Sequence, residues 1–534
     1  MLFAFLLVAG FSLVAWNQLT RVHLVRYLLN PDAVSYIDVA DRYASLDLTN
    51  AINGYWSPLV SWLLTIPIAL SFDPVVSFHY LNAVVAWCSI LVLYLLLRQI
   101  GTESFTSGAI ALAASVPIAS WSIRSLSPDL LFVLAILVSL LAMVRFTKAP
   151  TVKNAFIFGL SGSLIYFSKA FGLPLFILAV AGYVVASFMA TGSWDRQVYN
   201  RRNISAFTLS LGIPAIAWIA ALSLKYDQLM YSSSGTQNLW AISPLEKRGR
   251  GLPDLVFFGD INFWYDPTNR SIPPWSPLDT WADFLYWTGR FRENLFELWD
   301  YLGPFYVLAL FSGGAMAVYH VTKQHHASRK YVPMIVYAWI MMAVQPIVYS
   351  LIAVEPRYLW APFLLVFLLP MAAWRDVCRP LVPILCAIGL VATPAIAWMD
   401  PGTSTPQTIF AASRTFPTVA ASRDRATGLE LRPLICGQRI AASGQGSTSM
   451  YIAHYGDGAY HGAINTKNAE PGVIEEQLAE LHISVFFLWG STDDAPPSFL
   501  DGFNEVQVLG SKGLRVFILD QPRHEGGWIG ASCS

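Results

Sequence analysis

Charged residues are scarce in this sequence. Only 13% of its 534 residues are Asp, Glu, Lys or Arg, and 55% are hydrophobic, whereas soluble domains usually carry ~25% charged residues. This shortage excludes an ordinary soluble fold and predicts an integral membrane protein. The formal net charge is zero, so no overall basic excess points to nucleic acid as a partner.

Several common functional motifs are also missing. The sequence has no GxxxxGK[ST] loop, no strand-linked GxGxxG, and no HExxH, GxSxG or CxxC. Nucleotide-driven pumping, zinc hydrolysis and serine hydrolysis therefore have no support. Among the few cysteines, Cys88, Cys378 and Cys386 lie in or beside apolar runs. Cys436 and Cys533 belong to the polar C-terminal region, and whether they pair depends on that region being outside the cell.

Long apolar runs, by contrast, are abundant. A membrane-spanning helix needs ~20 mostly apolar residues, and the sequence predicts about eleven such helices, some of them shorter and flanked by charges or aromatics. The expected spans are 2–16, 77–97, 105–122, 127–144, 154–168, 171–190, 204–224, 304–321, 333–353, 358–374 and 381–398. We therefore expect an α-helical polytopic module over residues 1–398.

Lys and Arg are unevenly divided between the short loops. They concentrate in alternate loops, beginning with Arg98 and ending with Arg375 and Arg379, and the positive-inside rule makes those loops cytoplasmic. The N-terminus is then cytoplasmic, and residues 17–76, 225–303 and everything after about 399 lie outside. We expect a linker at 399–430 and a small extracytoplasmic α/β domain at 431–534, because short strand-like runs there flank a helix-like run.

The first outer segment carries two helical patterns. Asn30 followed by Pro31 predicts a helix that runs through about Ser45. Its period puts Asp32 on one face with Tyr36 and Tyr43, while Asp38 and Asp41 point the opposite way. The apolar run 58–70 is too short to span a bilayer, so we expect it to lie at the interface or to re-enter.

Four ionisable residues at the outer rim are candidate site residues: Asp32, Asp129, Lys169 and Arg357. Each has a simpler explanation. Asp32 and Asp129 begin helices and complement the helix dipole, Lys169 reaches toward headgroups, and Arg357 pairs locally with Glu355. Together, however, a carboxylate and separate cations at the mouths of several helices suit an anionic lipid-linked donor, with the carboxylate as base and the cations on its phosphate.

The pattern resembles the C-superfamily of lipid-phosphosugar-dependent glycosyltransferases, especially protein O-mannosyltransferases and lipid A aminoarabinose transferases. The resemblance rests on the run from Asp32 to Ala40, on Asn53-Gly-Tyr-Trp and the residues up to Trp62, on Lys169-Ala-Phe-Gly, and on Pro356-Arg-Tyr. It covers roughly residues 1–375. The C-terminal region contributes nothing to it.

The resemblance implies an inverting transfer of a sugar from a polyprenyl-phosphate donor to a lipid, glycan or protein acceptor at the outer face of an inner membrane. Asp32 takes the role of base, with Asp38 and Asp41 as alternatives because Ala33 follows it where many relatives have Glu. Lys169 and Arg357 contact the phosphate, and Asp129 or Glu355 forms a second acidic or substrate position. The expected substrate groove comprises Tyr36, Tyr55, Trp56, Tyr358, Asn238 and Trp240.

Some members of that superfamily bind a divalent cation and others do not, and we expect none to be essential here. No nucleic-acid partner is expected. Two rival functions stay open at this point. A transporter or flippase of lipid-linked glycans would need polar groups near mid-bilayer, where the spans have few. A non-catalytic assembly subunit would tolerate replacement of Asp32, Lys169 and Arg357.

Overall fold

Long helices make up most of the protein in the computed structural model. The structure describes residues 2–191, 198–244, 266–269, 275–322, 332–366, 418–464, 471–490, 496–508 and 513–519. Within these residues the long helices are α1 (Leu2–Val25), α5 (Pro74–Gln99), α6 (Ser104–Arg124), α7 (Asp129–Lys148), α8 (Val152–Ser168), α9 (Gly172–Thr191), α10 (Arg201–Tyr226), α13 (Trp281–Thr322) and α15 (Val332–Ser350).

These helices follow the predicted order. Six of the described helices are long and apolar enough to cross a membrane: α5, α6, α7, α9, α10 and α15. The prediction of a helical polytopic membrane protein is confirmed. Helix α1 continues to Val25, beyond the predicted end at residue 16. The predicted span 381–398 and most of the span 358–374 lie outside the described residues.

A glycine interrupts α13. Gly303 has φ 59° and ψ −161° inside this otherwise continuous helix, a backbone conformation that glycine adopts without a Cβ penalty. The break falls next to the predicted start of the span at residue 304. The residues before it, from Trp281 onward, therefore form a separate helical arm on the second outer segment.

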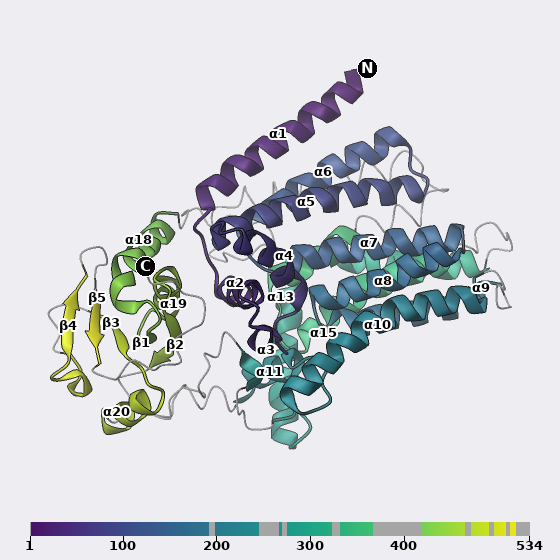
Figure 1. The fold of residues 1–534 in the computed structure, drawn as a ribbon. Helices are drawn as coiled ribbons and strands as arrows, with labels where there is room; N and C mark the ends of the chain where they lie inside the picture. Colours follow the sequence, from purple (N-terminus) through teal and green to yellow (C-terminus); the bar gives the residue numbers. More distant parts are fainter. Residues whose placement is uncertain are drawn as a thin grey trace.

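Short helices gather at one end of the long ones (Figure 1). They are α2 (Pro31–Ala44), α3 (Leu48–Ala51), α4 (Pro58–Ala69), α11 (Ser234–Ala241) and the 3-10 turns η1 (Pro267–Asn269) and η2 (Pro356–Leu359). Helix α2 begins as predicted, with Asn30 at the N-cap and Pro31 first. Helix α4 has only 12 residues and packs against α2, where Ser61 Oγ donates to the Tyr36 carbonyl at 2.9 Å.

The C-terminal residues form an α/β domain around one five-stranded sheet. The strands β1 (Arg439–Ser443), β2 (Ala459–Ile464), β3 (Val485–Trp489), β4 (Asn504–Gln507) and β5 (Leu514–Ile518) lie in the order β2-β1-β3-β5-β4. The pairs β1–β2 and β1–β3 are parallel, and β3–β5 and β4–β5 are antiparallel. The helices are α18 (Thr418–Ile435), α19 (Gly446–Tyr455) and α20 (Pro471–Glu480). Residues 418–430, which we assigned to a linker, thus begin α18.

Candidate functional site

The four candidate ionisable residues meet at the end of the helix bundle that carries the short helices. Asp32 lies in the first turn of α2, and Asp129 begins α7. Lys169 follows the last residue of α8, and Arg357 lies in η2. The long helices run in alternate directions, so helix starts and helix ends from distant parts of the chain come together here.

Arg357 forms the centre of this group. Its guanidinium contacts the Asp32 carboxylate, and its Nε lies 2.6 Å from Glu355 Oε2 and 3.7 Å from Asp129 Oδ2. Lys169 Nζ lies 2.5 Å from the other Asp129 oxygen, Oδ1. We call these five residues, Asp32, Asp129, Lys169, Glu355 and Arg357, the rim cluster. It contains two cations and three carboxylates.

Burial differs across the rim cluster. The Asp129 side chain is 3% exposed, whereas that of Glu355 is 46% exposed. Burial acts to lower the pKa of Lys169, but Asp129 and Tyr349 outweigh it and raise that pKa. For Arg357, burial is likewise outweighed by Asp32 and its other neighbours, so its pKa is raised. Both cations therefore stay charged at neutral pH, and an incoming anion would have to replace one of the carboxylates that hold them.

Two tyrosines support the cations. The rings of Tyr349 and Tyr358 stack at 4.3 Å, and Lys169 Nζ lies 4.2 Å from the Tyr358 ring centroid. Lys169 Nζ donates to the Tyr349 hydroxyl oxygen at 3.3 Å. The sequence analysis missed Tyr349, because a tyrosine near the end of a span is typical of the ordinary aromatic belt of membrane proteins.

An aromatic wall continues from the rim cluster toward the second outer segment. Tyr36 and Tyr55 both contact the Trp56 ring edge to face, at centroid distances of 5.1 and 4.6 Å. Tyr55 donates from its hydroxyl to Asn238 Oδ1 at 2.8 Å, which joins the wall to α11. Burial, and then the Asp32 charge, raise the pKa of Tyr36. Trp240 lies two residues further along α11, nearly opposite Asn238 on that helix.

The two alternative bases lie away from this group. Asp38 pairs with Arg42 one helical turn along α2, at 2.9 Å, and Asp41 is exposed. As the helical period predicted, neither shares the face of Asp32. Among the described residues, no group of three or more His, Cys, Asp or Glu could hold a metal ion.

A second ion pair joins the two outer segments. Lys225 Nζ lies 3.1 Å from Asp266 Oδ2, and the Tyr226 hydroxyl donates to the same carboxylate at 2.9 Å. The Tyr226 oxygen also accepts from the Gly54 amide at 3.1 Å. We call Gly54, Lys225, Tyr226 and Asp266 the loop clasp. It holds the turn that carries Tyr55 and Trp56 against the second outer segment.

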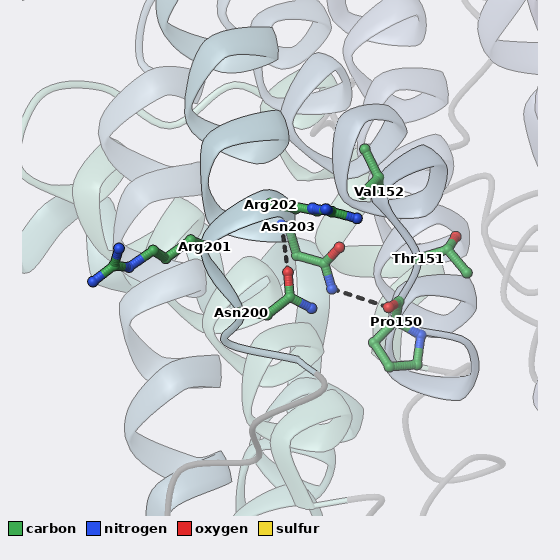
Figure 2. A pocket seen from close by; sticks show the side chains of 7 residues that line it. All are labelled: Pro150, Thr151, Val152, Asn200, Arg201, Arg202 and Asn203. Carbon is green, nitrogen blue, oxygen red and sulfur yellow. Dashed lines mark hydrogen bonds between the residues drawn. The ribbon is translucent and has the colours of Figure 1, made fainter.

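A separate cavity of about 450 Å³ lies at the opposite end of α8 from Lys169. Its lining is Pro150, Thr151, Val152, Asn200, Arg201, Arg202 and Asn203. Asn203 donates to the Pro150 carbonyl at 2.9 Å and so ties the starts of α8 and α10 together (Figure 2). This cavity shares no residue with the rim cluster.

The described helices define a polytopic membrane protein, as the sequence predicted, and the comparisons agree with the resemblance to C-superfamily glycosyltransferases. The family model described as "Dolichyl-phosphate-mannose-protein mannosyltransferase" matches residues 56–219, less than half of the chain. Helices α5 to α9 and most of α10, with Asp129 and Lys169, lie in that range.

Two solved structures are similar over nearly the whole chain. ArnT from Cupriavidus metallidurans bound to undecaprenyl phosphate has a TM-score of 0.54 and 13% identity, covering 96% of this chain and 97% of that chain. The apo state of the same protein has a TM-score of 0.46 and 13% identity, covering 96% and 98%. No curated protein sequence matches. The likeness to the bound ArnT structure, at this identity, shows the fold.

Proposed function

We propose that the protein is an inverting glycosyltransferase that moves a sugar from a polyprenyl-phosphate donor to an acceptor at the extracytoplasmic face of the membrane. The main support for this proposal is that Asp32, Lys169 and Arg357 lie in one ion-pair cluster although they come from three distant parts of the chain. The name of the matching family and the undecaprenyl phosphate bound to the ArnT structure support it. Hexosyl and pentosyl transfer are equally compatible with the cluster.

In the proposed reaction the donor phosphate occupies Lys169 and Arg357. The Arg357 fork suits two oxygens of a phosphate, and Lys169 adds a point charge. The acceptor atom attacks the anomeric carbon, its proton goes to Asp32, and the bond between that carbon and the phosphate oxygen breaks. The negative charge that develops on the leaving polyprenyl phosphate is balanced by the two cations.

In the proposed reaction, the contact between Arg357 and Asp32 breaks when the donor binds. In the empty site the Asp32 carboxylate contacts the Arg357 guanidinium. A donor phosphate competes for the same guanidinium. Once Arg357 turns to the phosphate, the Asp32 oxygen that it held can accept a hydrogen bond from the acceptor.

The proposed orientation places α2, the second outer segment and the C-terminal domain outside the cytoplasm. It rests on the distribution of Lys and Arg between the loops. Cys436, in the C-terminal domain, is disulfide-bonded, and disulfides persist in oxidising compartments. Its expected partner, Cys533, lies outside the described residues. The disulfide supports an extracytoplasmic domain.

The test is turnover of radiolabelled polyprenyl-phosphate sugars by membranes that carry the wild type or Asp32→Asn. Loss of a general base typically lowers a rate by ~10²–10⁴-fold, and we expect that loss in release of free polyprenyl phosphate. Asp41→Asn, on the exposed face of the same helix, is the matched control and keeps the wild-type rate. Turnover in the presence of a chelator tests the expectation that no divalent cation is essential.

Equal turnover by Asp32→Asn and wild type would move the base to Asp38, Asp41 or Asp129. No turnover of any donor by the wild type would instead favour the transporter or the assembly subunit.

A further inference from the structure

The C-terminal domain contacts the helix that carries Asp32. Within the domain, α18 and α19 pack together, and α19 also contacts α2. Figure 1 shows both helices on the side of the domain that faces α2, with the strand β4 at the far side. Helix α19 is therefore the element through which the domain contacts α2.

Two side chains attach the domain to the segment just before Asp32. The Tyr455 hydroxyl at the end of α19 donates to the Tyr27 carbonyl at 2.7 Å. The Arg425 guanidinium of α18 lies 4.4 Å from the centroid of the Tyr27 ring. Tyr27 belongs to the connection between α1 and α2, five residues before Asp32. The domain thus holds the backbone from which α2 starts.

Tyr451 lies one helical turn before Tyr455, on the same face of α19. It is half-buried and packs against the large hydrophobic core that runs through the membrane module and the C-terminal domain. Burial, and then the charge of Asp32, raise the pKa of the Tyr451 hydroxyl. Tyr451 therefore lies on the face of α19 from which Tyr455 reaches the segment before Asp32.

Tyr451 and the cations approach Asp32 from different elements. Lys169 and Arg357 lie with Asp129, Tyr349 and Tyr358, where the donor phosphate is expected. The carboxylates that act on Tyr451 are Asp32 and Asp424. In an inverting transfer the acceptor attacks opposite the leaving phosphate, so the base faces the acceptor.

We propose that the C-terminal domain forms the acceptor side of the site, with Tyr451 as a specificity-determining residue whose ring contacts the acceptor beside Asp32. This inference rests on the proposed glycosyltransferase function. It gives the C-terminal domain a part in the reaction, where the sequence left its role open. An aromatic ring supplies a large, rigid contact surface for an acceptor at little entropic cost.

The experiment uses membranes that carry the full chain and a radiolabelled polyprenyl-phosphate sugar. Two products are separated: label joined to membrane components, and free sugar formed when water replaces the acceptor. Tyr451→Ala is expected to lower the fraction of label on membrane components about tenfold, the size of one good aromatic contact. Total release of polyprenyl phosphate falls much less, because the donor side is intact. Tyr451→Phe keeps the ring and restores the wild-type fraction.

Phe503→Ala is the matched control, because it removes an exposed aromatic ring next to β4, at the edge of the sheet far from α19. Tyr451→Leu keeps apolar packing without a ring and replaces Tyr451→Ala if that variant melts early. An unchanged fraction of label on membrane components in both variants would overturn the inference. An equal loss of both products would also overturn it, since that marks a structural role. If the wild type itself moves no label, the proposed function fails first.

Discussion

The rim cluster and the loop clasp are both ion-pair groups at the same end of the protein, yet they are built differently. In the loop clasp one cation meets one carboxylate, and the Asp266 oxygens accept from Lys225, from Tyr226 and from the Thr268 amide at 3.2 Å. In the rim cluster three carboxylates share two cations, and the exposed fraction of the side chains reaches 46% at Glu355.

This difference separates a structural group from a reactive one. A buried carboxylate with a complete set of partners stabilises the contact it makes and has no oxygen to spare for a substrate. A cation shared among several carboxylates can exchange one of them for an incoming anion. The comparison predicts that changes in the rim cluster affect turnover, and that changes in the loop clasp affect stability.

After Asp32→Asn, the largest effect is expected for Arg357→Lys. Lysine keeps the charge but loses the fork that contacts Asp32, Glu355 and the donor phosphate. Removing one such charge-stabilising donor typically costs ~10²–10³-fold in turnover, measured as release of polyprenyl phosphate. The melting temperature changes little. Arg290→Lys is the control, because within the part of the chain that the structure describes Arg290 pairs with Glu293, a 57% exposed side chain three residues along α13. Equal losses in both variants would contradict a role for the Arg357 fork.

Asp266→Asn tests the other half of the comparison. It leaves Lys225 without its charged partner in a place where both side chains are largely buried, 13% and 7% exposed. Breaking such a pair costs about 3–5 kcal/mol, measured as a lower melting temperature of the purified protein. Turnover well below that temperature is expected to stay within about tenfold of wild type, because the rim cluster is untouched. A large loss of turnover with no loss of stability would reverse the assignment.

Gly54→Ala is a finer probe of the loop clasp. A Cβ at Gly54 would lie 2.8 Å from Thr268 Oγ1 and 3.1 Å from Met230 Sδ, so those side chains must move. Overpacking of this kind costs about 1–3 kcal/mol, and we expect the lower end because both contacts are to side chains. Gly235→Ala is the control, since a Cβ there meets nothing within 4 Å in α11. It should leave the melting temperature unchanged or raise it.

The sequence predicted the members of the rim cluster better than their contacts. Asp32, Lys169 and Arg357 stood out because charges are rare at the rim of apolar helices. Nothing in the sequence pairs Arg357 with Asp32, because that contact joins residues 325 positions apart and depends on how the helices pack. Tyr349 was missed because its surroundings are ordinary for the end of a span.

The C-terminal domain was predicted only in outline. The strands β1, β3 and β5 lie in the strand-like runs that the sequence offered near residues 437–441, 484–489 and 514–519. Strand β2 contains His461 and Gly462, and β4 has four residues from Asn504 to Gln507, so neither carries the hydrophobic pattern of a strand. They form strands because β2 pairs with β1 and β4 pairs with β5, which are more apolar. The contact of α19 with α2 was beyond sequence reasoning for the same reason as the rim cluster.

The smallest effect is expected for Asp38→Asn. This variant tests whether an ion-paired carboxylate must stabilise the protein. Asp38 is paired with Arg42, but burial raises its pKa from 3.8 to about 6 despite that partner. The folded protein therefore binds an additional proton between pH 3.8 and about 6, and the contribution of Asp38 to stability is lost as pH rises through this window. At pH 7.5 we expect the variant to be more stable than wild type by about 1 kcal/mol or less, because the asparagine oxygen still accepts from Arg42.

The gain should shrink when melting is measured near pH 4, where Asp38 is protonated in the folded wild type. Turnover by Asp38→Asn should match wild type, because Asp38 lies on the opposite face of α2 from Asp32. A loss of turnover would return Asp38 to the list of bases. A gain in stability that did not depend on pH would mean that the carboxylate charge is not what destabilises this position. Pairing alone, then, does not identify a functional carboxylate: Asp38 has its cation and is expected to be dispensable, while Asp32 shares one and is expected to be essential.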